Sequence, residues 1–248
     1  MSPGFCQRCR TILLAIGVAA PPLSVVAQDA VTVVRIEELA APTRGVGQDT
    51  DAAIRIDDVA VGLNGVYKIG DWTPISVEVS TDEAAHVTLS VQTIDPGGHP
   101  VILPVAEVDL AEGGTHRIDG VYKSGRLASP VVVRLLADGQ VVASRTLRPA
   151  AVDEDGSEAE LRQSTLLVVT FGRPAGFDLL EAGESGPDRE LKVVELDQAE
   201  SLPATLDGLA ALDVLAVAGG YNQIDERRSR VIQDWVQHGG HLIVAVGE

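Results

Sequence analysis

Sulfur is scarce in this chain of 248 residues. Its two cysteines, Cys6 and Cys9, both lie near the N-terminus, and only one methionine is present. The Cys-x-x-Cys spacing occurs in redox and zinc sites, but this pair precedes an apolar run that is typical of a signal peptide. If that segment is removed, the remaining chain has no thiol. We therefore expect neither a disulfide nor a cysteine nucleophile in the mature protein.

Aromatic side chains are also few, at 3% of the sequence, whereas hydrophobic residues make up 45%. A packed core is thus expected, and it must consist mainly of Val, Leu, Ile and Ala. Valine recurs in short alternating runs, which favours β-strands.

Positively charged residues are few relative to acidic ones. The chain has 19 Lys and Arg against 36 Asp and Glu, a formal net charge of −17. Residues 1–27 contain Arg8 and Arg10 and no acid, so the charge without them is −17 − 2, or −19. A surface of this sign repels nucleic acid and anionic lipid, and we expect no nucleic-acid partner.

No hydrophobic run is long enough to span a bilayer comfortably. The apolar stretch at residues 11–20 follows Arg8 and Arg10 and is followed by two prolines. Residues 1–27 are predicted to be a signal peptide cleaved after Ala27, and an uncleaved anchor helix is the alternative. The protein is therefore expected to be exported, to the periplasm or the cell envelope.

The first part of the remaining chain reads as a β-sandwich. Residues 28–52 form an extended lead-in, and residues 53–149 contain about seven short strands separated by Gly, Pro and Asn-Gly turns. In residues 73–80, Ile75, Val77 and Val79 alternate with polar residues, as one buried face requires. This pattern predicts an immunoglobulin-like (Ig-like) sandwich.

Two similar phrases lie inside this region, Gly65–Gly70 (GVYKIG) and Gly120–Gly125 (GVYKSG). Each is interpreted as a turn at the end of a strand, with its tyrosine capping the core. Trp72 is interpreted as an anchor in the core or at its rim. The segment 150–163 is rich in acids and is predicted to be an exposed linker.

Residues 164–248 have a different pattern. Continuous apolar runs at 164–172, 191–196, 212–220 and 241–247 predict strands of a parallel sheet. A helix is predicted between the last two runs, capped by Asp225 and ending near Gly239. Its buried face should contain Val231, Ile232, Trp235 and Val236. Because the last strand has no following helix, this α/β domain is expected to be incomplete at residue 248.

The strand from Asp213 to Gly219-Gly220, the helix ending at Gly239-Gly240, and the strand His241–Gly247 resemble the class I glutamine amidotransferase-like fold, a flavodoxin-like parallel sheet. In the active enzymes a cysteine follows the last strand. Here Val246 or its neighbour takes that place, so His238 and His241 would be bases without a nucleophile. We expect no catalytic residue, no metal and no cofactor. A ligand site is predicted at Gly219, Gly220 and Tyr221, where parallel sheets bind ligands.

Sandwich and amidotransferase-like domain together resemble uncharacterised bacterial envelope proteins of planctomycete type, often with a later transmembrane helix. The resemblance implies a non-enzymatic exported protein that binds or scaffolds an unknown envelope protein or a small ligand. A membrane anchor beyond residue 248 would fit it. Two alternatives stay open: a hydrolase or amidotransferase-related enzyme with catalytic residues outside this sequence, and a structural module of a membrane assembly.

Overall fold

The computed structural model describes residues 53–148, 160–172, 177 and 190–245. All of them belong to one compact unit. The predicted signal peptide, the lead-in, most of the linker and residues 246–248 at the predicted elbow lie outside the described residues. The described part consists mostly of β-strands, and none of its helices is long and apolar enough to cross a membrane.

Two antiparallel sheets occupy the predicted first domain. Their facing side chains make a single core to which Ile75, Val77 and Val79 contribute from one sheet and Val87, Leu89 and Val91 from the other. The predicted alternation of buried and outward residues is therefore present. The sheet β1-β3-β6 contains β1 (Ile54–Val61), β3 (Trp72–Thr81) and β6 (Thr115–Lys123); the sheet β5-β4-β7-β8 contains β4 (Ala85–Ile94), β5 (Pro100–Leu110), β7 (Val131–Ala137) and β8 (Gln140–Leu147).

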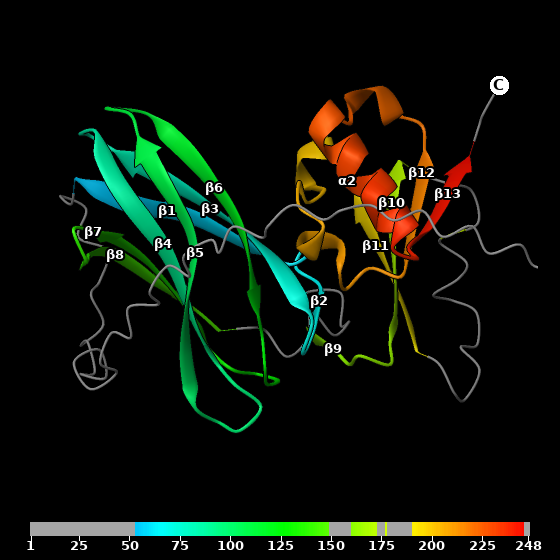
Figure 1. The fold of residues 1–248 in the computed structure, drawn as a ribbon, viewed down its shortest axis with the longest axis horizontal. Coiled ribbons are helices and arrows are strands. Elements are labelled where there is room, and N and C mark those ends of the chain that lie inside the picture. The colour runs from blue at the N-terminus through cyan, green and yellow to red at the C-terminus, as the bar shows by residue number, and fades with distance from the viewer. Residues whose placement is uncertain (1–52, 149–159, 173–176, 178–189, 246–248) are drawn as a thin grey trace, which may run out of the picture. The chain divides into compact units, whose positions relative to one another are not determined.

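A four-stranded sheet with all strands parallel forms the second domain. Its central strand β10 is buried on both faces, as a continuous apolar run predicts. Helix α2 (Glu226–Gln237) lies against one face of the sheet (Figure 1). The strand order is β11-β10-β12-β13, with β10 (Leu166–Gly172), β11 (Leu191–Leu196), β12 (Val214–Ala218) and β13 (His241–Ala245).

Helix α2 begins where the sequence predicts. The Asp225 carboxylate accepts the Arg228 backbone N–H at 2.7 Å, and this bond lowers the pKa of Asp225 below its ordinary value. Ile232 and Trp235 are buried in the core, and Val231 packs against it in part. Val236 is 39% exposed, so the prediction that it is buried is wrong. A helix turns by about 100° per residue, which takes Val236 away from the face centred on Trp235.

A short segment of the first domain's sequence belongs to the core of the second. Leu63 and Val66 pack with the buried residues of β10, β12 and α2. The next residues form β2 (Tyr67–Lys68), which pairs in parallel with β9 (Glu160–Leu161). Gly65–Gly70 is therefore more than a turn capping the first core. Both residues of β9 are buried, so the prediction of an exposed acidic linker is wrong at Glu160 and Leu161, whereas Arg162 and Gln163 are exposed.

Lys68 and Asp213 form an ion pair across these two parts of the sequence. The ammonium group of Lys68 donates to Asp213 Oδ2, and the same oxygen accepts the Leu167 backbone N–H at 2.7 Å. The Lys68 side chain is 5% exposed and that of Asp213 is 36% exposed. A lysine this deeply buried requires a charged partner, so the pair fixes β2 at the start of β12.

Glu160 lies close to the tyrosines of both Gly-Val-Tyr-Lys phrases and bonds to one of them. Its buried carboxylate accepts the Tyr67 hydroxyl at 2.8 Å and the Ala128 backbone N–H at 2.5 Å. Burial, then the neighbouring Tyr122, and then the bond to Glu160 raise the pKa of Tyr67 above its ordinary value. Burial and Glu160 also raise the pKa of Tyr122. Both tyrosines are thus buried and uncharged, whereas Trp72 at the start of β3 is 38% exposed at the rim.

We predict an asymmetric response to breaking the Lys68–Asp213 pair. Asp213→Ala leaves a buried ammonium without a partner and should lower the free energy of unfolding by about 2–4 kcal/mol. Lys68→Met leaves a carboxylate that water can reach and should cost about 1 kcal/mol. Urea unfolding followed by Trp235 fluorescence in a Trp72→Phe background measures both values. Glu226→Gln, in an exposed pair with Arg230, is the control and should change stability by less than about 0.5 kcal/mol. Equal small effects of both core variants would contradict the assignment.

A second prediction concerns Gly240, which follows α2. A Cβ at this position would overlap the Trp235 ring, whereas the Gly240 backbone itself needs no left-handed conformation. Gly240→Ala should therefore displace Trp235, shift its fluorescence emission and destabilise the protein by about 1–3 kcal/mol. Gly97→Ala is the matched control, because its Cβ would meet only the side chains of Asp95 and His99. An unchanged emission spectrum for Gly240→Ala would refute the packing explanation.

Candidate functional site

The carboxyl edge of the parallel sheet carries a cavity of about 270 Å³. Three of its lining residues are glycines that follow β-strands: Gly172 ends β10, and Gly219 and Gly220 follow β12. Open parallel sheets bind their ligands at this edge, because the chain leaves the strands there as loops. The other lining residues are Phe171, Glu195, Leu196, Asp197, Ala218 and Gln223.

The three glycines are required for different reasons. All have positive φ, +73° at Gly172, +85° at Gly219 and +64° at Gly220, so a side chain would strain each of them. A Cβ on Gly172 would also collide with the carbonyl oxygen of Ala218, and one on Gly220 would lie 3.1 Å from the Phe171 ring. A Cβ on Gly219 would meet nothing within 4 Å. Packing therefore explains Gly172 and Gly220, while Gly219 leaves its backbone open beside the cavity.

The polar side chains of this cavity are mostly hydrogen-bond acceptors. Glu195 lies near the end of β11 and Asp197 directly after it, and both side chains are exposed. The one lining amide is that of Gln223, in the 3₁₀ turn η4 (Tyr221–Gln223). The Gln223 backbone N–H donates to the Gly220 carbonyl at 2.8 Å, which holds this turn against the glycines. Two carboxylates favour a ligand that donates hydrogen bonds or carries positive charge.

The structure brings together two of the three predicted ligand residues. Gly219 and Gly220 line the carboxyl-edge cavity, whereas Tyr221 does not line it and is 71% exposed. Glu195, Asp197 and Gln223 were missed by sequence reasoning. The sequence does hold a signal for the first two, since they end the apolar run of β11 as Gly219 and Gly220 end that of β12.

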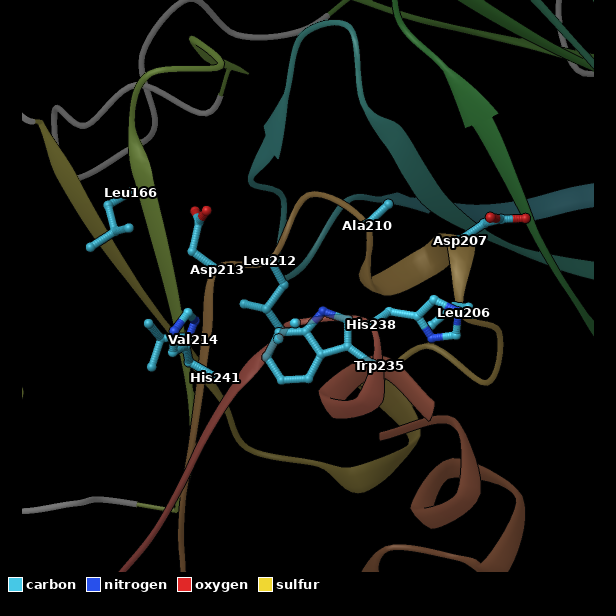
Figure 2. A pocket seen from close by; sticks show the side chains of 12 residues that line it. Leu166, Leu206, Asp207, Ala210, Leu212, Asp213, Val214, Trp235, His238 and His241 are labelled. Atoms are coloured by element: carbon cyan, nitrogen blue, oxygen red, sulfur yellow. The ribbon is translucent and has the colours of Figure 1, made fainter. Parts of the chain in front are cut away.

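The two histidines lie at the opposite edge of the sheet. His238 and His241 stand before and at the start of β13, and they line a second cavity of about 630 Å³ at the amino ends of the strands (Figure 2). Nδ1 of His238 lies 2.7 Å from the Asp234 carbonyl oxygen. Neither histidine lines the carboxyl-edge cavity.

This amino-edge cavity has mainly apolar walls. They come from the starts of β10 and β12, the end of α2, and the segment around the 3₁₀ turn η3 (Asp207–Leu209). Its titratable lining residues are Asp207, Asp213, His238 and His241. Within the described ranges, no three His, Cys, Asp or Glu residues are arranged to hold a metal ion.

Comparison with known sequence families gives a single named match. Residues 55–150, less than half of the chain, match a family described as "Domain of unknown function (DUF8726)". These are the residues of the two antiparallel sheets, so the match supports treating them as one evolutionary unit. No curated protein matches the chain.

Comparison with solved structures gives only weak likenesses. A putative β-galactosidase from Bacteroides fragilis has a TM-score of 0.31 and 12% identity over 79% of this chain and 41% of its own. A Niemann-Pick type C2 protein from Japanese carpenter ant has a TM-score of 0.30 and 6% identity over 40% of this chain and 93% of its own. The Pseudomonas fluorescens DNA glycosylase AlkC has a TM-score of 0.28 and 16% identity over 41% of this chain.

This chain spans 32% of the AlkC chain and 41% of the putative β-galactosidase. At these TM-scores the three structures carry no argument about the function of the protein.

Proposed function

We propose that the protein is an exported, non-enzymatic binding protein of the cell envelope. In this proposal the antiparallel sheets are an Ig-like sandwich, and the parallel sheet is an amidotransferase-like domain that binds a ligand without catalysis. The observation that carries the proposal is the open backbone of Gly219 at the carboxyl-edge cavity. A glycine whose side-chain space is empty lets a ligand approach the main chain closely.

The chemistry of the lining residues supports binding over covalent catalysis. Among the described residues, the side chains that line the carboxyl-edge cavity include carboxylates and an amide, but no hydroxyl, thiol, amine or imidazole. Nucleophilic enzymes of the related fold attack a carbonyl with a thiolate, which requires such a group at this edge. The ligand favoured by Glu195 and Asp197 is small and carries an ammonium, guanidinium or amide donor.

A second function has one observation in its favour. Glu195 and Asp197 line the same cavity, and paired carboxylates can act as general acid and general base in a hydrolase. Both side chains are exposed to water, whereas the general acid of such a hydrolase is held in an apolar pocket. Binding therefore remains the better-supported proposal.

Three small probes test the proposed binding site: n-propylamine, acetamide and acetate. Ligand-observed NMR titration of the full chain should show n-propylammonium and acetamide binding at about millimolar affinity, and acetate binding at least about ten-fold more weakly. Gln223→Ala should weaken acetamide binding by about ten-fold. Gln140→Ala, on β8, is the control and should leave it unchanged. Equal binding of acetate would contradict the proposed site.

Ammonia release from L-glutamine and acetamide tests the absence of catalysis. The full chain should release no more ammonia than a protein-free control. Release that Asp197→Asn lowers by ten-fold or more would instead support the hydrolase.

A further inference from the structure

The amino-edge cavity is left unused by the proposed function. Its volume of about 630 Å³ lies in the range of pockets that hold small organic ligands. Such pockets combine apolar walls with a few fixed polar groups. Here the apolar side chains are those of Leu166, Leu206, Ala210, Leu212, Val214 and Trp235.

One polar group of this cavity is held in place before any ligand arrives. Asp213 Oδ2 accepts both the Lys68 ammonium and the Leu167 backbone N–H. Within the described part of the chain no further group bonds to this carboxylate, so Oδ1 can still accept a hydrogen bond. The side chain is 36% exposed and lines the cavity, which makes Oδ1 accessible to a ligand. A carboxylate fixed by two bonds loses little freedom when it accepts a third.

The charge around the cavity selects against anions. Asp207 and Asp213 line it together with His238 and His241, and in the described part of the chain no lysine or arginine lines it. In Figure 2, Asp213 and His241 lie on one side of the Trp235 ring, with Asp207 and His238 on the other. Lys68 already neutralises the charge of Asp213, so the Asp213 side of the cavity suits a neutral hydrogen-bond donor such as a hydroxyl. The Asp207 side chain is exposed and its carboxylate has no partner among the described residues, so that side of the cavity also tolerates a cation.

We infer that the amino-edge cavity is a binding site for a small apolar molecule that carries a hydroxyl or ammonium donor and no negative charge. The apolar body would contact the wall formed by Trp235, Leu212 and Val214, and the donor would bond to Asp213 Oδ1 or to Asp207. This site is separate from the carboxyl-edge cavity, since the two share no lining residue.

Three phenyl probes test the site in the full chain: 2-phenylethanol, phenethylamine and phenylacetate. Ligand-observed NMR titrations should give saturable binding for the first two, with phenylacetate bound at least about ten-fold more weakly. Ala210→Phe fills part of the cavity and should abolish binding of all three. Ala210 is exposed, so this variant is expected to fold. Ala84→Phe, in the exposed loop between β3 and β4, is the matched control and should bind the probes as the parent chain does.

The charge selection has its own test. Asp207→Asn should bring the affinities of phenethylamine and phenylacetate to within about three-fold of each other while leaving that of 2-phenylethanol unchanged. The inference is overturned if no probe binds up to about 10 mM, if Ala210→Phe binds like the parent chain, or if phenylacetate binds as well as phenethylamine. Gln223→Ala should not change binding of these probes. Loss of binding in that variant would move the site to the carboxyl-edge cavity and so overturn this inference without affecting the proposed function.

Discussion

The ion pair between Lys68 and Asp213 is the contact on which the arrangement of the described residues depends. It joins positions that lie 145 residues apart in the sequence. It places the buried ammonium group of Lys68 beside Asp213, the residue directly before β12. With Lys68 in this position, Leu63 and Val66 pack in the core beside the parallel sheet, and β2 pairs with β9. Because a buried charge without a partner is costly, the loss of Asp213 would destabilise the packing of this segment in the second core.

The same pair gives the two edges of the parallel sheet different characters. At the amino edge Asp213 is tied to Lys68 and Leu167, so its position is set by the fold. At the carboxyl edge the chain turns through glycines with positive φ, and the backbone rather than a fixed side chain faces the cavity. An apolar pocket with one fixed acceptor suits shape recognition, whereas an open backbone beside two carboxylates suits recognition of hydrogen-bond donors.

Local features were the ones that the sequence could predict. The Asp225 cap, the buried Trp235 and the apolar strands β10 and β11 each follow from residues within one helical turn or one strand. Partnership across the chain was not predictable in this way. An apolar residue such as Leu63 or Val66 is marked for burial by its hydrophobicity, but nothing in its neighbours says which core it joins. Glu160 was assigned to an exposed acidic linker because its sequence neighbours are acidic. Its burial depends on Tyr67 and Ala128, which lie far away in the sequence.

The same difference between local and long-range features applies to the candidate site. Gly219 and Gly220 were predicted because a glycine pair after an apolar strand is a local signal, but their adjacency to Glu195 and Asp197 arises from the parallel order of β11, β10 and β12. The sequence pattern also cannot distinguish a glycine that close packing requires from one whose side-chain space is open. Gly220 is explained by the Phe171 ring at 3.1 Å, and Gly172 by the Ala218 carbonyl. Only the backbone angle, a φ of +85°, requires glycine at position 219. No described atom would meet a Cβ there, so the proposed ligand has room to approach the main chain.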